Sequence, residues 1–525
     1  MTSYPSIFND VIGPVMRGPS SSHCAASLRI ARICRDLMDG DIRHILIEFD
    51  PNGSLATTHK SQGSDMGLFG GFLGWEADDE RLPESEQFLA EVGISVEFVI
   101  RDIGAAHPNT YQLTLTNEQE CRRLTAISTG GGMIEVIAIE GAAVSMAGDY
   151  YETLIGTSDI EPIKKYLENT VAYDFITVHA GEIPFISVKA QVFPDDVIIR
   201  ELASMEQVQF IKKLRHVMPV MARKDLQVPF ITCDEMMAYN QGQQKALWEL
   251  ALDYEMARGN ISAAEVMDKM RAIIRVMDNA IQQGLKGTEY KDRILGSQSP
   301  RFREKMKAGE LVAGDAVNNM ILYVSAIMEV KSSMGVIVAA PTAGSCGALP
   351  GALFGVAHAL GLGEEELVKA MLSAGLIGVF IAAHATFAAE VGGCMAETGS
   401  GGGMAAAAIV QLKGGTLEQS IAAASMALQN SLGIICDPIG NRVEAPCLGR
   451  NVMAAGNAIS SANMALSDYV HLVSLDEVIA TMKVVGDQIH HTLRCTNLGG
   501  LSVTPSAKKI EAMLEVQTIQ LYKSC

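Results

Sequence analysis

The sequence predicts an α+β protein, in which an N-terminal α/β domain and a small α/β module precede a mostly α-helical domain. Before about residue 200, the strand-like segments 44–50 and 96–102 alternate with the amphipathic helical segment 25–38. Beyond that point the strand signal fades, and helix-forming residues dominate to the end of the chain. At 525 residues the chain is too long for one hydrophobic core, so we expect several domains.

A second α/β pattern starts at Gly130. The strand-like "GGGMIEVIAIEG" leads into the helical "IEPIKKYLENTV", and "FITVHAG" and "PFISVKAQV" follow as strands. We interpret this segment as a small, ACT-like module that is either ligand-binding or regulatory. The predicted domains are therefore residues 1–129, 130–200 and 201–525.

The helical domain combines amphipathic helices with irregular loops. Segments 240–259 and 261–284 have apolar residues three and four positions apart, and a glycine closes each. The stretch 311–480 is rich in Ala, Gly and Met, and it is interrupted by "PTAGSCGALPG", "GGCMAETGSGGG" and "CDPIGNRVEAPC". We expect these interhelical loops to carry the chemistry.

Composition narrows the class of partner. Hydrophobic residues make up 48% of the chain and charged residues 19%, which indicates a folded protein with a large buried surface. The formal net charge of -19 argues against binding to nucleic acid or to an anionic membrane surface, because those partners attract Lys and Arg. A small metabolite is the favoured partner.

The sequence also bears on location. Residues 1–20 lack the basic and apolar regions of a secretory signal, so we expect a cytoplasmic protein. Residues 370–389 form a run without formal charge that is long enough to span a bilayer. Its small residues favour a tightly packed internal helix instead, because they let neighbouring backbones approach.

Three of the ten cysteines stand in loop-like surroundings within the helical domain. They are Cys394, Cys436 and Cys447, separated by 41 and 10 residues. Three thiolates do not close a zinc site, but they suit a [4Fe-4S] cluster that leaves one iron open as a Lewis acid. Spacing alone leaves open the alternative that all three are small buried hydrophobic residues.

The N-terminal motif "GPSSSH" (Gly18 to His23) is a candidate anion site. Gly and Pro fix a turn, and the hydroxyls and amides of three serines can converge on a carboxylate where a helix begins. The alternative is a helix-capping serine cluster beside a surface histidine. Further along, the turn "HPNT" holds His107 rigidly.

These motifs resemble those of the iron-sulfur-dependent L-serine dehydratases, also called L-serine ammonia-lyases. In the N-terminal part, "GPSSSH", "NGSLATTHKSQGSD", "HPNT" and "GGGMIEV" are similar to the β domain of that family. In the helical part, "APTAGSCGALPG", "EVGGCMAETG", "LGIICDPIGNRVEAPCLGRN" and "NLGGLS" are similar to its catalytic α domain. The resemblance covers most of the chain and implies a single-chain form with the β domain first.

The resemblance implies both a reaction and a cofactor. Cys394, Cys436 and Cys447 take the places of the ligands of a [4Fe-4S] cluster, whose open iron polarises the C–O bond of L-serine. A base removes the α-proton, water leaves, and hydrolysis yields pyruvate and ammonia. The enzyme would be a lyase of amino-acid degradation and gluconeogenesis, and we expect a homodimer that binds neither nucleic acid nor membrane.

The same resemblance suggests further site residues. The candidates for substrate binding are Ser20, Ser21, Ser22 and Asn109. Some relatives end on a cysteine that caps the open iron, and Cys525 invites that interpretation. The alternative is an exposed terminal thiol.

The sequence departs from the family at the catalytic base. Gln62 stands where relatives usually have a histidine, and an amide cannot accept a proton at neutral pH. The candidates for the base are His23, His107 and His59, with Lys60 next. An extended strand would turn His59 away from position 62, so His59 could serve only if a turn lies between them. We favour His23 or His107, which need no such turn.

Several alternative functions stay open. A related lyase would act on L-threonine or L-cysteine. A pyridoxal-phosphate lyase would use "GSGGGMAAAA" as a phosphate cup, although no Schiff-base lysine stands out and glycines also permit close helix packing. A non-catalytic amino-acid sensor is the third alternative, because a family resemblance does not secure activity.

Overall fold

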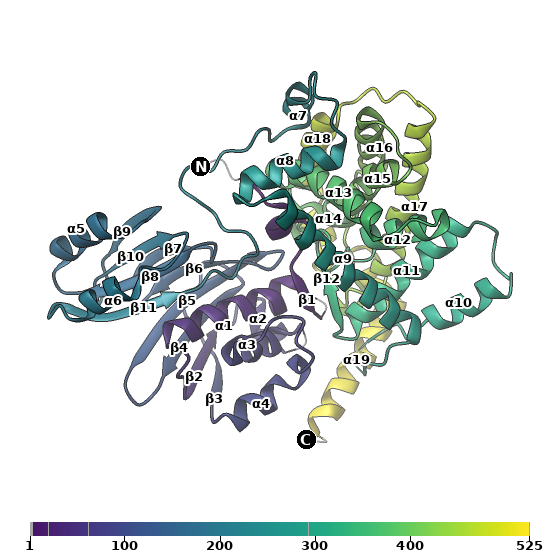
Figure 1. Cartoon of the computed structure of the whole chain (residues 1–525). Coiled ribbons are helices and arrows are strands. Elements are labelled where there is room, and N and C mark those ends of the chain that lie inside the picture. The colour runs from purple at the N-terminus through teal and green to yellow at the C-terminus, as the bar shows by residue number, and fades with distance from the viewer. Residues whose placement is uncertain (1–3, 19, 61, 292, 524–525) are drawn as a thin grey trace. The chain divides into compact units, whose positions relative to one another are not determined.

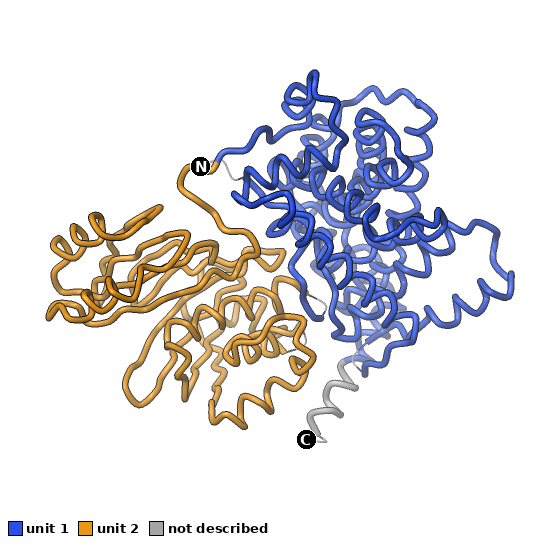
Figure 2. The backbone as a smooth tube through the Cα atoms, in the orientation of Figure 1, with its two compact units in different colours: residues 1–19, 227–525 blue, residues 20–226 orange. Residues whose placement is uncertain are grey.

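The chain forms two compact units in this computed structural model, which describes residues 4–18, 20–60, 62–291 and 293–523, with side chains to residue 514. Residues 20–226 form one unit, which is built on two β-sheets. Residues 1–19 and 227–525 form the other, which is mostly helical (Figure 2). The predicted α+β class, with a mixed-sheet part before a helical part, is confirmed.

The first sheet of the 20–226 unit has six strands in the order β3-β2-β4-β5-β6-β7 (Figure 1). β2 and β3 are parallel, and the other neighbours are antiparallel. The core contains buried aliphatic and aromatic residues of this sheet and of the helices packed on it. The strands are β2 (His44–Phe49), β3 (Ser95–Ile100), β4 (Thr110–Thr116), β5 (Cys121–Gly130), β6 (Met133–Ile139) and β7 (Ala142–Met146).

Helices α1 (Ala26–Leu37) and α3 (Ser64–Leu73) pack closely within this unit, while α4 (Ser85–Glu91) contacts α3. Gly67 of α3 makes the close approach possible, because a Cβ there would collide with the Cys24 carbonyl oxygen. Gly71 plays the same part against the carbonyl oxygen of Leu28. This packing holds residues 20–23, which lead into α1, next to residues 62–65, which lead into α3.

The second sheet has four antiparallel strands in the order β11-β8-β10-β9. With α5 (Ile160–Thr170) and α6 (Asp196–Ala203) it forms a β-α-β-β-α-β succession of the ferredoxin-like type. A small apolar core joins the sheet to both helices. The strands are β8 (Tyr151–Thr157), β9 (Phe175–His179), β10 (Phe185–Ala190) and β11 (Val208–Leu214).

The expected boundary at residue 130 falls in a hairpin. Gly130, Gly131 and Gly132 all have positive φ, and the strands on either side of them, β5 and β6, pair in the six-stranded sheet. The ferredoxin-like elements run from β8 to the end of β11, which is later than the expected 130–200 module. The ACT-like identity and regulatory role of this module stay predictions, as do the domain boundaries.

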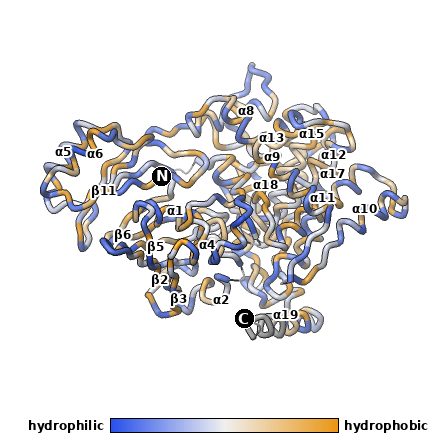
Figure 3. Tube along the Cα trace, turned by 60° about the horizontal axis from the view of Figure 1, so that its bottom comes forward, coloured by the Kyte–Doolittle hydropathy of each residue, from blue (hydrophilic) through white to orange (hydrophobic). Residues whose placement is uncertain are grey.

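The helical unit is built around α13 (Glu364–His384), which packs against α8 (Leu247–Gly259), α9 (Ala263–Lys286) and α15 (Ser400–Leu412). By length and hydropathy α13 could cross a membrane, but 78% of its apolar window is buried in the unit. This burial agrees with the expected internal helix. The sequence of α10 (Ser299–Lys307), by contrast, is mostly hydrophilic (Figure 3).

The N-terminal residues belong to this helical unit. The η1 turn (Ile7–Val11) packs on α13, where Gly375 faces Ile7 and Gly378 faces Val11. β1 (Val15–Arg17) pairs antiparallel with β12 (Val336–Val338). Glu255 of α8 is fully buried and accepts hydrogen bonds from the Ser6 hydroxyl at 2.5 Å and the Ile7 amide at 2.8 Å.

Candidate active site

The "GPSSSH" segment brings its histidine into a hydrogen-bonded site. Ser20 precedes the short η2 turn (Ser21–Ala25), and its hydroxyl lies 2.8 Å from His23 Nδ1 and makes no capping bond. His23 Nε2 lies 3.0 Å from the Thr58 hydroxyl oxygen, and Thr58 donates its own proton to the Ser54 carbonyl at 2.6 Å. His23 Nε2 is therefore the donor to Thr58, and Nδ1 accepts from Ser20.

His23 is buried, and this determines its charge. Burial, assisted by the nearby His59 imidazole, lowers the pKa of His23 to about 4. At neutral pH the ring is therefore uncharged, and its one acceptor nitrogen is already occupied by Ser20. His23 is suited to orienting the serine hydroxyl rather than to taking up a proton.

His59 has a different environment. Its Nδ1 lies 2.6 Å from Asp65 Oδ1, and its ring packs against Phe49 and Phe98, with centroid distances of 5.3 and 5.0 Å. Because an ionised carboxylate only accepts hydrogen bonds, Nδ1 carries a proton and Nε2 is the basic nitrogen of the neutral ring. We call Ser20, His23, Thr58, His59 and Asp65 the histidine site.

The segment between His59 and Gln62 is a turn rather than an extended strand. α2 (Leu55–Thr58) runs into it, the Gln62 amide donates to the Thr58 carbonyl at 2.9 Å, and the Ser64 amide donates to the His59 carbonyl at 2.7 Å. The turn that a catalytic role for His59 requires is therefore present. The turn returns the chain so that Asp65, at the start of α3, reaches the imidazole of His59.

The "HPNT" turn is linked to the same region by hydrogen bonds. Asn109 accepts a hydrogen bond from Ser54 on its side-chain oxygen, and its amide donates to His107 Nδ1 at 3.1 Å. Nδ1 of His107 is thus an occupied acceptor, and the proton of the neutral ring lies on Nε2. His107 therefore supports the turn that presents Asn109. Ser54 was not singled out from the sequence.

Of the other two candidate serines, Ser21 is buried in the first turn, whereas Ser22 is partly exposed. Their predicted role in binding a carboxylate stays a prediction. Lys60 is exposed beside His59. The histidine site thus unites two separate motifs within the 20–226 unit, and the hydrogen bond between Ser54 and Asn109 connects the "HPNT" turn to one of them.

Four cysteines come together in the helical unit, and we call them the thiol cluster: Cys394, Cys436, Cys447 and Cys495. Cys394 ends α14 (Ala389–Cys394) and Cys447 begins α17 (Cys447–Leu466). The Cys436 thiol is in hydrogen-bonding contact with the thiols of Cys394 and Cys495, and these contacts together with burial raise its pKa. Burial and then the Cys394 thiol raise the pKa of Cys447, and Cys495 adds to this effect.

A buried ion pair supports the thiol cluster. Arg450, on the first turn of α17, donates to Cys394 Sγ at 3.4 Å and to Asp437 Oδ1 at 2.5 Å. Asp437 accepts the Leu501 amide with its second oxygen at 2.7 Å. The guanidinium therefore places a positive charge beside a sulfur atom, which favours thiolate ligation of a metal.

Two charged residues hold the loops around the cysteines. Lys331 of α11 (Asp315–Ser332) is fully buried and donates to the Val443 carbonyl, inside the loop that joins Cys436 to Cys447. Glu397 accepts from the Thr342 hydroxyl, and burial raises its pKa to about 7. This bond joins the "PTAGSCG" loop to the segment after Cys394.

The chemistry of the thiol cluster fits an iron-sulfur cluster. All four cysteines are free of disulfides, and three are buried. Within the part of the chain that the structure describes, no three histidine, cysteine or acidic side chains form a ready ligand group for a metal ion. The Cys436 thiol contacts those of Cys394 and Cys495 instead, so a bound group has to separate these three. The predicted ligand Cys525 lies outside the described residues.

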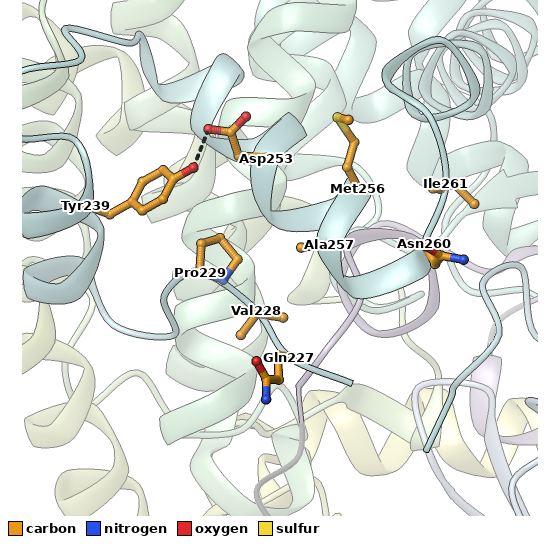
Figure 4. A pocket seen from close by; sticks show the side chains of 9 residues that line it. All are labelled: Gln227, Val228, Pro229, Tyr239, Asp253, Met256, Ala257, Asn260 and Ile261. Atoms are coloured by element: carbon orange, nitrogen blue, oxygen red, sulfur yellow. Dashed lines mark hydrogen bonds between the residues drawn. The ribbon is translucent and has the colours of Figure 1, made fainter. Parts of the chain in front are cut away.

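A pocket of about 700 Å³ lies elsewhere in the helical unit (Figure 4). Nine residues from 227 to 261 line it, and none of them is a cysteine or a histidine. Its acidic group, Asp253, is already paired, with Lys245 at 2.5 Å and with the Tyr239 hydroxyl at 3.2 Å. The pocket thus offers no reactive group comparable to the other two sites.

Known proteins match both parts of the chain. Residues 242–502 match the family "Serine dehydratase alpha chain". The probable L-serine dehydratase alpha chain of Bacillus subtilis (strain 168) is 35% identical over 282 residues, which cover 54% of this chain and 94% of that protein. The L-serine dehydratase alpha chain of Peptoniphilus asaccharolyticus is 38% identical over 267 residues, which cover 50% and 91%.

The beta chains of such enzymes match as well. The probable L-serine dehydratase beta chain of Bacillus subtilis is 32% identical over 221 residues, or 40% of this chain and 98% of that protein. The fold, the two sites and these matches define an enzyme of the lyase class. The chain belongs to the serine dehydratase family, in the form that joins β-type and α-type sequences in one polypeptide.

Proposed function

We propose that this chain is an L-serine dehydratase that converts L-serine to pyruvate and ammonia with the help of a [4Fe-4S] cluster. The observation that carries the proposal is the convergence of Cys394, Cys436 and Cys447, which come from separate segments of the helical unit. Relatives whose names state this activity match both parts of the chain. The substrate is inferred from those names.

Three thiolates would hold the cluster, supported by the neighbouring positive charge. When bound, it would supply a Lewis acid, an iron without a protein thiolate, that polarises the hydroxyl of the substrate. Arg450 places its positive charge beside the sulfur of Cys394, and Cys447 stands at the N-terminus of α17, where the helix dipole favours a bound anion. Lys331 keeps the connecting loop in place.

We assign removal of the α-proton to His59. The Asp65 carboxylate accepts the Nδ1 proton, so Nε2 is the nitrogen that can receive the proton of the substrate. The carboxylate then stabilises the imidazolium that forms, as in other histidine-carboxylate pairs. Stacking against Phe98 and packing against the tilted ring of Phe49 keep the imidazole from rotating away.

The other candidates are better suited to positioning. His23 is neutral and buried, and it fixes the hydroxyl of Ser20 for substrate binding. His107 holds the amide of Asn109 and so the turn that carries this side chain. Neither has an acceptor nitrogen that is available without first breaking a hydrogen bond. Gln62 can orient a ligand with its amide but cannot act as a base.

The pyridoxal-phosphate alternative finds little support. Residues 399–403 continue directly from the η4 turn (Met395–Gly399) into α15, so their amides are not those of a free helix N-terminus. A Cβ at Gly402 would press on the Ala454 carbonyl, and one at Gly403 would collide with Leu428. Close helix packing therefore accounts for these glycines. The buried Lys331 is occupied by a backbone carbonyl.

An anaerobic assay tests the proposal. Protein reconstituted with iron and sulfide should form pyruvate and ammonia from L-serine in equal amounts, and L-threonine, L-cysteine and D-serine provide the comparison. Faster elimination from L-threonine or L-cysteine would reassign the substrate. Amino-acid binding without any product, in protein with a full complement of cluster, would favour the sensor. The cytoplasmic location and the homodimer stay predictions.

A further inference from the structure

Cys495 is a member of the thiol cluster that the sequence motifs did not include. It lies between the η6 turn (His491–Leu493) and the η7 turn (Gly500–Val503). Its amide donates to the Cys436 carbonyl at 2.8 Å, and the Cys436 amide donates to the Leu493 carbonyl at 2.8 Å. This bridge fixes the backbone of Cys495 directly beside a predicted cluster ligand.

The side chain of Cys495 is directed toward the other thiols. It contacts the Cys436 thiol and packs in one small apolar cluster with Cys394, Ala389 and Ile434. It is also close enough to interact electrostatically with Cys447. Four cysteine side chains from four segments of the chain therefore face one region.

The backbone of Cys495 is strained. Its φ of +62° lies in the left-handed region, which residues other than glycine, asparagine and aspartate rarely adopt. Such strain persists only where the surroundings enforce it, and it gathers at functional sites. Here Arg494 donates to the Ile489 carbonyl at 2.6 Å, and Leu501 donates to Asp437, so both ends of the segment are held.

We propose that Cys495 is the fourth thiolate ligand of the cluster in the protein without substrate. The inference rests on the proposed function, because it assumes that the cluster binds at Cys394, Cys436 and Cys447. A [4Fe-4S] cluster commonly takes four cysteine thiolates, one for each iron. Cys495 is half-buried where the other three are buried, so it is the ligand that an incoming molecule would displace.

Mössbauer spectroscopy tests this assignment without reference to activity. The parent and the variants Cys495→Ser, Cys495→Gly and Cys525→Ser are reconstituted anaerobically with ⁵⁷Fe and sulfide, in the absence of substrate. Glycine is included because it tolerates the left-handed backbone. The matched control is Cys525→Ser, which removes the terminal thiol and leaves the thiol cluster intact.

We expect the parent to show four irons with sulfur-only ligation. In both Cys495 variants one iron in four should acquire the larger isomer shift of an iron with an oxygen or nitrogen ligand, and Cys525→Ser should match the parent. Loss of the whole cluster from both Cys495 variants but not from Cys525→Ser would also support the assignment.

Two results would overturn the assignment of Cys495 but leave the proposed cluster intact. One is a parent-like spectrum with full iron content in both Cys495 variants, and the other is the one-iron change in Cys525→Ser but in neither Cys495 variant. A parent that binds zinc, or that binds no iron and sulfide, would instead overturn the proposed cluster and this inference with it. Iron and sulfide analysis of the parent therefore separates the two failures.

Discussion

The His59–Asp65 pair offers a sharp test of the proposed base, through the substitution Asp65→Asn. The 2.6 Å contact joins two side chains with relative exposures of 21% and 15%, so solvent screens it only in part. An amide of the same shape removes the negative charge that stabilises the imidazolium. A hydrogen bond to a charged group contributes about 1.5–3 kcal/mol, which corresponds to a roughly 10- to 150-fold lower kcat.

The assay compares pyruvate formation with exchange of the α-proton of L-serine in deuterated buffer, for anaerobically reconstituted protein of equal iron content. His59→Ala should lose about 10²- to 10⁴-fold in both, as expected for removal of a general base. Because Asp65 acts through His59, the double variant should be no slower than His59→Ala alone. Added imidazole should partly restore exchange in His59→Ala.

The exposed Asp41 supplies a matched control, since it pairs with Arg43 at 3.5 Å away from the histidine site. Asp41→Asn should exchange at the parent rate. If His59→Ala and Asp65→Asn both exchange at the parent rate as well, the assignment of the base is wrong. A full loss in His107→Ala or His23→Ala alone would move the role to that residue.

Other predictions concern the cluster and the stability of the fold. After reconstitution, each of three variants should be colourless: Cys394→Ala, Cys436→Ala and Cys447→Ala. The control Cys34→Ala, which removes a buried thiol of the other unit, should keep its iron. Full iron content and activity in any of the first three variants would remove that cysteine from the ligand set. Activity should be lost in air and return with Fe(II) and a thiol, so an enzyme indifferent to air and to iron chelators would contradict the mechanism. Burial raises the pKa of Glu152 to about 7, above its value in the unfolded chain, although Lys189 opposes the shift. The protonated carboxyl therefore contributes stability at low pH, and this contribution is lost as the pH rises through about 7. Between pH 5 and pH 8, the free energy of unfolding of Glu152→Gln, measured with urea, should therefore rise by up to about 3 kcal/mol relative to that of the parent. Glu168→Gln, at a more exposed position, should show no such trend.

Local patterns were sufficient to predict the class of fold and many of its elements. Period-two and period-3.6 patterns reflect which residues of a segment are buried, so β2, β3 and α1 fall where they were expected. Contacts between segments that are far apart in the sequence leave no such periodic pattern. The N-terminal residues join the helical unit because Ile7 and Val11 fit against glycines of α13, and nothing in residues 1–19 indicates that partner.

The sequence could not distinguish a glycine that ends a helix from one that lets two helices pack closely. Gly284 was expected to close a helix, but α9 runs through it to Lys286. A Cβ at Gly284 would collide with the backbone at Ala326 of α11, so the glycine serves helix packing. Gly287, with φ of +105°, is the residue that ends the helix.

The candidate site was predictable in its residue types but not in its pairings. His59 and Asp65 are six residues apart, and only the turn after α2 brings them together. Cys495 stands two residues before the "NLGG" motif, so a search for cysteines beside glycine-rich segments would have found it. Arg450 and Lys331 act through contacts with distant loops, which local sequence does not encode.

We propose that elimination of water from L-serine depends on an iron-sulfur cluster bound by Cys394, Cys436 and Cys447. The most direct measurement is a titration of anaerobic apoprotein with iron and sulfide, in which bound iron, acid-labile sulfide and the rate of pyruvate formation are followed together. We expect the rate to be zero in the apoprotein and to rise in proportion to the content of iron-sulfur cluster. A metal-free protein that forms pyruvate at the full rate, or a fully loaded one that forms none from L-serine, would contradict it.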